Sequence, residues 1–344
     1  MTATTIITRV LRGFDDASFG PAQWNGLLAT GQSDVVFLTW QWQSAWWDTF
    51  GRGELLLIAA ERDGGVVTLA PLFSEAGMVY FVGAGGSDYL DFIGDISDPD
   101  VLAAILVEAR GHVADFIGFV FHHVPDASAT GPLLQQAAAR LGLRIFDEGS
   151  QSAPALEIPL DGTAAIEAAK KKSLVRHEKS FTRLGPLHVE HLTDGDAILP
   201  HLDEFFAQHL ARWAGTSSPS LFNEERQRRF YHEVARRAGK TGWLRFTRIG
   251  WQGRAIAFHF GFCHRGSFLW YKPSFAIDLA KQSPGEVLLR HLLLAAAAEG
   301  AHTFDFGLGD EAFKSRFATR VNVVRNWGLY EPNAVAEQAP AQSP

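Results

Sequence analysis

Three apolar segments follow one another near the middle of the second half of the chain, and they constrain the fold more than any other feature. The segments are Trp243–Ile249, Arg254–Cys263 and Ser267–Ser274, and only the short turns Trp251-Gln252-Gly253 and His264-Arg265-Gly266 separate them. Connections this short join antiparallel neighbours, because parallel strands need a crossover of a dozen residues or more. The sequence therefore predicts an antiparallel meander in this region.

An apolar helix is predicted directly after the meander, over Pro284–Glu299, followed by a strand over Thr303–Gly307. Ser283 and Glu286 have the spacing of a capping box, in which each side chain bonds the other residue's backbone amide. Proline is favoured at the first position of a helix, and Gly300 stands where a helix commonly ends. We expect well-defined boundaries for this helix.

The start of this helix is also a candidate phosphate site. Free amides and the positive end of the helix dipole attract anions, and Lys281, Gln282, Ser283 and Gly285 would surround such a ligand. The alternative is that the segment is simply a well-capped helix. Glu286 favours that alternative, since its carboxylate competes for the same dipole.

The remaining sequence alternates strand-like and helix-like stretches, which predicts an α/β (α+β) fold with mixed, largely antiparallel sheets flanked by helices. A chain of 344 residues is long for one core. We expect an N-terminal domain over 1–160, a second domain over 161–332 and a flexible tail over 333–344. The two halves share a similar order of elements without a visible repeat of residues.

Composition excludes several classes of protein. The net charge of −7 gives no general attraction to nucleic acid, so no DNA partner is expected. The single cysteine, Cys263, fits a reducing cytoplasm, and the most apolar run, Val287–Ala298, is too short to cross a bilayer. We expect a cytoplasmic protein. The sequence has no paired cysteines and no His-Glu-x-x-His motif, so neither of these patterns predicts a metal site. The adjacent His122 and His123 would point to opposite faces of a strand and could not share a metal ion.

Four residues of the second half are candidates for chemistry. Asp305 lies in an alternating apolar strand, where a carboxylate is costly unless it is paired. Lys314 follows the loop after this strand and has the spacing to pair with Asp310. His259 alternates with two phenylalanines and is a candidate general base, and Tyr271 is a candidate acid. A structural role, in the core or in a cap, is an open alternative for each.

A cationic helix face and an acidic loop are candidate substrate sites. Lys172, Arg176, Lys179 and Arg183 are spaced by four, three and four residues, so they share one helix face. Such a face suits a nucleotide sugar, a lipid diphosphate, a membrane surface or RNA, although an ordinary solvated face is the commoner case. The glycine-rich segment before Ser87 leads to a second candidate, and its acidic and aromatic residues are Asp88, Tyr89 and Asp91.

Taken together, these segments resemble the CelD/BioF2-like acetyltransferase family, a bacterial branch of the GNAT superfamily related to the FemAB peptidoglycan-bridge transferases. The shared features of the N-terminal half are Trp40-Gln41-Trp42, Ala70-Pro71-Leu72 and Asp88-Tyr89-Leu90-Asp91. Those of the C-terminal half are the basic helix ending at Gly185, Ser283-Pro284-Gly285, and Asp305-Phe306-Gly307-x-Gly309 followed by Lys314. The resemblance spans residues 35 to 330.

The resemblance implies tandem GNAT-like units, the first of them degenerate and on the acceptor side. It implies an acyl-CoA donor, acetyl-CoA or a longer thioester, bound at Lys281, Gln282, Ser283, Gly285 and Lys314. The usual GNAT motif Gln-x-x-Gly-x-Gly is absent here, and FemAB relatives take acyl groups from aminoacyl-tRNA. The long helical hairpin of FemAB proteins is also absent, which favours a thioester over tRNA.

The leading hypothesis is an N-acyltransferase that acylates an amino sugar in exopolysaccharide or cell-envelope synthesis. Asp305 or His259 would deprotonate the amine and Tyr271 would protonate the leaving thiolate. Lys172, Arg176 and Arg183, with Asp88, Tyr89 and Asp91, would bind the acceptor. Open alternatives are acylation of a lipid amine such as a sphingoid base, a non-catalytic nucleotide-binding module, and an aminoacyl-tRNA transferase. A further open alternative is that the protein makes peripheral contact with the inner face of the cytoplasmic membrane.

Overall fold

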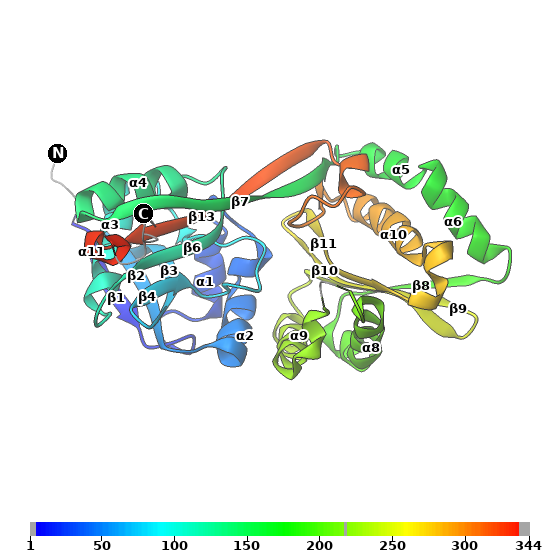
Figure 1. Cartoon of the computed structure of the whole chain (residues 1–344), viewed down its shortest axis with the longest axis horizontal. Helices are drawn as coiled ribbons and strands as arrows, with labels where there is room; N and C mark the ends of the chain where they lie inside the picture. The colour runs from blue at the N-terminus through cyan, green and yellow to red at the C-terminus, as the bar shows by residue number, and fades with distance from the viewer. Residues whose placement is uncertain (1–4, 217–218, 337–344) are drawn as a thin grey trace, which may run out of the picture. The chain divides into compact units, whose positions relative to one another are not determined.

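The computed structural model describes residues 5–216 and 219–336, and within it the chain forms two compact units (Figure 1). The first unit contains the chain up to Ser152 and again from Asn322 onwards, and the second contains Ala153–Val321. Strands β7 (Arg144–Glu157) and β13 (Arg320–Tyr330) carry the chain from one unit to the other. The sequence places the boundary near 160 and assigns 322–332 to the second domain, whereas β13 pairs with β6 of the first unit.

The first unit is a mostly antiparallel sheet with helices around it. Its strand order is β1-β2-β3-β4-β6-β13-β7, with β4 and β6 parallel. The strands and the short β5 are β1 (Ile7–Leu11), β2 (Glu54–Arg62), β3 (Gly65–Glu75), β4 (Met78–Phe81), β5 (Ile93–Gly94) and β6 (Gly118–Pro125). The helices are α1 (Pro21–Leu28), η1 (Val36–Leu38), α2 (Trp40–Phe50), α3 (Pro99–Gly111) and α4 (Thr130–Leu141).

The second unit contains the predicted antiparallel meander. The strands lie in the order β7-β12-β11-β10-β9-β8, and only the β11–β12 pair is parallel. Their bounds are β8 (Leu187–Leu192), β9 (Leu244–Trp251), β10 (Arg254–His264), β11 (Ser267–Phe275) and β12 (Thr303–Asp305). The turns between β9, β10 and β11 use a left-handed residue followed by glycine, at Gln252-Gly253 and Arg265-Gly266. These turns suit the right-handed twist of antiparallel hairpins.

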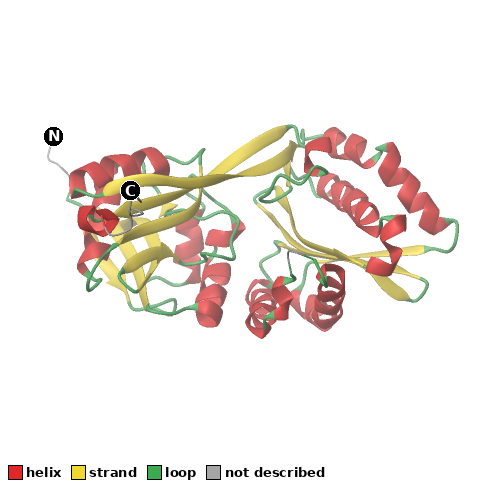
Figure 2. Cartoon of the chain, viewed as in Figure 1, coloured by secondary structure: helices red, strands yellow, loops and turns green. Residues whose placement is uncertain are grey.

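Helices cover both faces of this second sheet (Figure 2). On one face lie α5 (Thr163–Ala169), α6 (Lys172–Thr182) and α10 (Pro284–Ala298), and on the other lie α8 (Leu202–Trp213) and α9 (Glu225–Ala238) (Figure 1). The remaining elements are α7 (Gly195–Ile198), η2 (Leu199–His201), η3 (Leu221–Asn223), η4 (Ile277–Gln282), η5 (Lys314–Arg316) and, in the first unit, α11 (Pro332–Ala336). The structure confirms the predicted α/β class, with mostly antiparallel strands flanked by helices.

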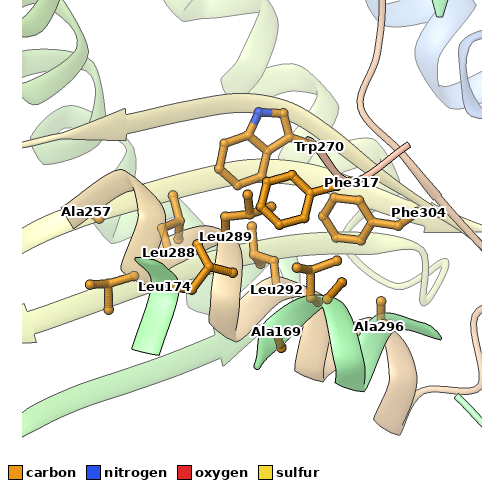
Figure 3. Close-up of a cluster of buried hydrophobic side chains, with 14 of the residues drawn as sticks. Ala169, Leu174, Ala257, Trp270, Leu288, Leu289, Leu292, Ala296, Phe304 and Phe317 are labelled. Carbon is orange, nitrogen blue, oxygen red and sulfur yellow. The ribbon is translucent and has the colours of Figure 1, made fainter. Parts of the chain in front are cut away.

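The core between α10 and the second sheet is apolar and continuous. Leu288, Leu289 and Leu292 of α10 point into a cluster that includes Trp270 of β11 and Phe304 of β12 (Figure 3). These three leucines are at most 2% exposed. Helix α10 is thus fixed to the sheet along its length, and its first turn lies at one end of β11.

Three short elements depend on local backbone geometry. Helices α5 and α6 are separate, because Lys171 between them has an extended backbone with a ψ of 135°. The segment after β12 contains only the 3-10 turn η5. Residues 333–336 of the predicted flexible tail lie in α11, which begins with a proline at its first position. Residues 337–344 of that tail lie outside the described residues.

Removal of a buried α10 side chain should destabilise the second unit. We expect Leu292→Ala to lower the free energy of unfolding by about 2–5 kcal/mol, because it leaves a cavity in a closed core. Urea unfolding followed by tryptophan fluorescence measures this change. The control is Leu160→Ala at a side chain that is 99% exposed, and a similar loss in that variant would contradict the assignment of the core.

Candidate functional site

A pocket of about 230 Å³ lies at the start of α10, entirely within the second unit. Its walls come from the last turn of α8, the end of β11, the first turn of α10 and the segment around η5. The apolar lining residues include Trp270, Phe275, Leu289, Phe313 and Phe317, and the polar ones are Arg212, Ser274, Ser283, Glu286 and Arg316. A few polar groups that converge on an apolar hollow are typical of a small-molecule site.

The first turn of α10 presents its backbone to this pocket. Ser283 has a left-handed conformation, φ 57° and ψ 58°, and its side chain forms no cap. Its carbonyl instead accepts the amide of Glu286 at 3.0 Å. Among the described residues the amide of Gly285 has no hydrogen-bond partner. The predicted capping box is therefore absent, while the predicted helix end at Gly300 is confirmed by its positive φ of 70°.

Glu286 is held away from the helix start by an ion pair. Its Oε1 accepts from Nη1 of Arg316 at 2.9 Å, and Nη2 of the same arginine donates to Ser173 Oγ at 2.7 Å. The guanidinium thereby ties α10 to α6 and offsets the charge of the carboxylate. This removes part of the competition with an anionic ligand that the sequence suggested.

Arg212 is the most informative group in the pocket. It donates from Nη1 to the carbonyl of Pro273 at 2.9 Å and stacks over the ring of Phe275 at 4.3 Å. Burial lowers the pKa of Arg212 to about 10, so the guanidinium is still charged at neutral pH. No carboxylate of the described residues pairs with it. A half-buried cation without a counter-ion is costly unless a ligand supplies the negative charge.

Ser274 is a second unsatisfied group in the same wall. Its side chain is fully buried, and its Oγ has no hydrogen-bond partner among the described residues. Buried hydroxyls are nearly always bonded, so an orphan that borders a pocket marks a place for a ligand atom. The hydroxyl can donate to a carbonyl oxygen or accept from an amine.

The predicted donor-binding residues near α10 divide into two groups. Ser283 and Gly285 line the pocket. Lys281 and Gln282 are exposed and do not line it. The left-handed turn at Ser283 separates the two pairs.

Lys314, the fifth predicted donor-binding residue, has a structural role. It is 3% exposed and directs its ammonium to the carbonyl of Leu308 at 2.6 Å and that of Gly307 at 3.3 Å. Its third partner is Glu311, at 2.8 Å, in place of the predicted Asp310. All three of its protons are thus engaged in holding the loop after β12.

Two of the three predicted catalytic residues lie on opposite faces of the sheet. His259 is fully buried and its ring stacks with Trp270 on the α10 face, while Tyr271 packs against Tyr231 of α9 on the other face. A hydrogen bond does link them, but it comes from the backbone amide of Tyr271, which donates to His259 Nε2 at 3.2 Å. The two side chains therefore do not converge on one reacting group.

Asp305, the third predicted catalytic residue, forms a hydrogen bond within its own loop. It is 9% exposed, and its Oδ1 accepts the amide of Gly307 at 2.8 Å. Neither Asp305 nor His259 nor Tyr271 lines the pocket.

The predicted acceptor residues of the first unit are mostly internal. Asp91 is 1% exposed and accepts from Ser33 Oγ at 2.5 Å, from the amide of Phe92 at 2.9 Å and from Thr130 Oγ1. Burial raises the pKa of Asp91, and these bonds partly offset that rise. Tyr89 is also buried and Asp88 is half-buried. Asp91 therefore joins three segments of the first unit.

The predicted basic face exists on α6. Lys172, Arg176 and Arg183, with Lys170 and Lys179, line an open groove of about 340 Å³ on the second unit. Sequence spacing therefore located this cationic surface correctly. By contrast, no group of three metal-ligating side chains occurs within residues 5–216 and 219–336.

The pocket contains residues that the sequence did not reveal, namely Arg212, Ser274, Trp270 and Arg316. In the sequence, Arg212 is recognisable only as an arginine at the end of an amphipathic helix, and arginines at such positions are common. Ser274 stands at the end of a strand and carried no signal. Only the fold brings these positions together with the start of α10.

The chain is similar to known proteins in part of its sequence and in its fold. Residues 168–315 match the family model described as acetyltransferase (GNAT) domain. The second unit is similar to a GNAT acetyltransferase domain over most of its length. The match includes all the pocket residues except Arg316 and Phe317. No curated protein matches the sequence.

Solved structures share the fold at low sequence identity. FemX is 11% identical with a TM-score of 0.64, over 92% of this chain and 97% of that one. A protein described as L-PGS, from Bacillus licheniformis, is 14% identical with a TM-score of 0.55, over 85% and 92% of the two chains. The C-terminal domain of a putative lysylphosphatidylglycerol synthetase from Agrobacterium fabrum is 16% identical with a TM-score of 0.51, over 86% and 90%. These likenesses establish the fold. Among the described residues no helix is long and apolar enough to cross a membrane.

The burial of His259 predicts a specific pH dependence of stability. Desolvation lowers its pKa to about 3 in the folded protein, whereas an unfolded histidine has a pKa of about 6.5. Between these values only the unfolded chain binds the proton, so stability falls as the pH drops below about 6.5. The His259→Gln variant lacks this titration and keeps an acceptor for the Tyr271 amide.

Urea unfolding between pH 7 and 5 tests this assignment. We expect the free energy of unfolding to fall more steeply with acidification in the wild type, by up to about 1.4 kcal/mol per pH unit. Identical slopes in the wild type and His259→Gln would show that His259 is accessible to protons in the folded protein, as a general base would be.

Proposed function

We propose that the protein is an N-acyltransferase whose donor, a coenzyme A thioester, binds in the pocket at the start of α10. The observation that carries this proposal is Arg212, a charged guanidinium in an apolar wall with no carboxylate partner among the described residues. Coenzyme A offers the matching chemistry, since it carries a diphosphate on a long, largely uncharged arm. The match of residues 168–315 to a GNAT domain supports acyl transfer as the reaction class.

The lining residues suggest how the donor would be held. Arg212 and the amide of Gly285 would bind phosphate oxygens, because a helix start and a guanidinium both favour anions. The rings of Trp270, Phe275 and Phe317 would contact the arm. Ser274 would form a hydrogen bond with a polar group of the arm next to the diphosphate.

The reaction itself needs little else from the protein. An uncharged amine attacks the thioester carbonyl, the new C–N bond forms, and the C–S bond breaks as the thiolate leaves. The amine loses a proton and the thiolate gains one. Positioning the two reactants is the largest contribution expected of the site. Asp305, His259 and Tyr271 lie outside the pocket lining, so the sequence-based assignment of these proton transfers has no support from this geometry.

The pocket size fits one part of the donor. A volume of about 230 Å³ is below the range of about 300–1,000 Å³ that is common for drug-sized ligands. It has room for the diphosphate and the adjoining part of the arm. We propose acetyl-CoA as the donor because residues 168–315 match a family model described as acetyltransferase (GNAT) domain. The proposed acceptor is an amino sugar, on the basis of the motifs shared with the CelD-like family.

A thermal unfolding experiment tests the donor site with a matched pair of variants. A Cβ at Gly285 would lie 3.2 Å from the Phe275 ring, whereas a Cβ at Gly26 in α1 meets nothing within 4 Å. We expect acetyl-CoA to stabilise the wild type and Gly26→Val by about 2.7 kcal/mol at a hundred times the dissociation constant, a shift of a few degrees. Gly285→Val should show no shift, because its side chain fills the pocket.

ATP and a long-chain acyl-CoA complete that experiment. An equal rise in the unfolding temperature with ATP would show that the pocket binds phosphates in general and does not distinguish coenzyme A. No shift with any thioester would remove the donor assignment, and transfer activity destroyed by ribonuclease would then identify aminoacyl-tRNA as the donor.

A second prediction concerns Arg212 directly. We expect Arg212→Gln to weaken acetyl-CoA binding by roughly ten- to a hundredfold, because hydrogen bonds to charged groups contribute about 1.5–3 kcal/mol. Isothermal titration calorimetry measures the affinity. Arg140→Gln is the control, since Arg140 is exposed and pairs with Asp100 in the first unit. Unchanged affinity in Arg212→Gln would contradict the proposed site.

A further inference from the structure

The outer face of α6 carries cations along a shallow groove. Lys170, Lys172, Arg176, Lys179 and Arg183 line it, and its volume is about 340 Å³. The 11 residues of α6 correspond to about 16 Å of helix. The chain as a whole has a net charge of −7. The α6 face is therefore a local cluster of positive charge on an acidic protein.

This face, which we call the α6 groove, has few acidic groups to neutralise it. The acidic residue within α6, Glu178, turns inward and pairs with Arg290 at 3.2 Å and His291 at 2.9 Å. Lys170 pairs with Glu167 in α5. In the described part of the chain, no ion pair involves Lys172, Lys179 or Arg183.

Elsewhere, many arginines at the surface are paired. Arg245 with Glu299 at 2.7 Å and Arg325 with Asp126 at 2.7 Å are examples. Like charges three or four residues apart destabilise a helix. The α6 groove thus opposes folding by a small amount, and a partner of opposite charge would compensate for it.

We propose that the α6 groove binds the surface of an anionic phospholipid bilayer. Lipid phosphates would occupy the groove among the cations. Leu184, which directly follows Arg183 and is 69% exposed, would reach the boundary between headgroups and acyl chains. A cationic face with an exposed apolar residue at its end is typical of proteins that lie on a membrane surface.

The composition of the groove favours a bilayer over nucleic acid. Proteins that bind single strands stack bases on aromatic side chains, and no aromatic residue is among the described residues that line the α6 groove. The other lining residues are Val175 and Ser180. An exposed leucine has no role against a phosphate backbone but gains free energy in a bilayer.

The proposal does not depend on the proposed reaction. The donor pocket and the α6 groove share no described residue, so loss of membrane binding and loss of thioester binding are separate results. Membrane binding would place the protein where lipid-linked acceptors occur, whichever acyl donor it uses.

Vesicle sedimentation with the full chain tests the proposal. The probes are vesicles of phosphatidylcholine alone and of phosphatidylcholine mixed with phosphatidylglycerol. We expect binding only to the anionic vesicles. The triple variant Lys172→Gln, Arg176→Gln, Lys179→Gln should reduce the partition coefficient roughly a hundredfold, since each cation near an anionic surface contributes a roughly equal factor.

The control variant removes three exposed cations elsewhere, Arg12→Gln, Arg144→Gln and Lys240→Gln. It has the same net charge as the triple variant and should bind anionic vesicles like the wild type. Equal losses in both variants would show a non-specific charge effect and overturn the proposal. Absence of wild-type binding, or binding of a short RNA but not of vesicles, would also overturn it. Thermal unfolding verifies that both variants are folded.

Discussion

The packing of α10 against β10 and β11 is the interaction on which the rest of the second unit depends. Its leucines fill the space beside Trp270 and Phe304, so the helix cannot move along the sheet without opening the core. The position of its first turn is fixed as a result. Since β11 ends shortly before that turn, the chain must reverse through η4 and Ser283. This reversal creates the hollow in which the candidate site lies.

The same constraint explains why the site holds unsatisfied groups. The carbonyl of Pro273, the Oγ of Ser274 and the ring of Phe275 all belong to the end of β11, and α8 brings Arg212 beside them. Arg212 is partly desolvated there and Ser274 entirely, yet neither meets a carboxylate among the described residues. A protein without a ligand for this pocket would gain stability from an apolar residue in either position. We attribute their presence to the proposed anionic donor, which would also form a hydrogen bond with the Ser274 hydroxyl.

The sequence predicted the elements better than it predicted the site. Short turns with glycine indicated the meander, and Pro284 and Gly300 marked the bounds of α10, because these signals are local. The spacing of the α6 cations likewise located one face of a helix. In contrast, the sequence assigned His259 and Tyr271 to one reaction, as base and as acid, although their side chains point to opposite faces of the sheet.

The contact between Arg212 and the end of β11 shows why the rest of the site could not be predicted. Arg212 lies far from Ser274 and Ser283 in the sequence, and no local pattern relates these positions. Only the packing of α8 on β11 brings them to one pocket. The unsatisfied state of Ser274 is likewise a property of the folded core, since a serine at the end of a strand is ordinary in a sequence.

A crystal structure with acetyl-CoA tests the central claim most directly. The account predicts electron density for the diphosphate within hydrogen-bond distance of Arg212 and the Gly285 amide, with the adjoining part of the arm near Ser274. Density for the diphosphate elsewhere on the chain, or an empty pocket at a concentration that saturates binding in solution, would contradict it.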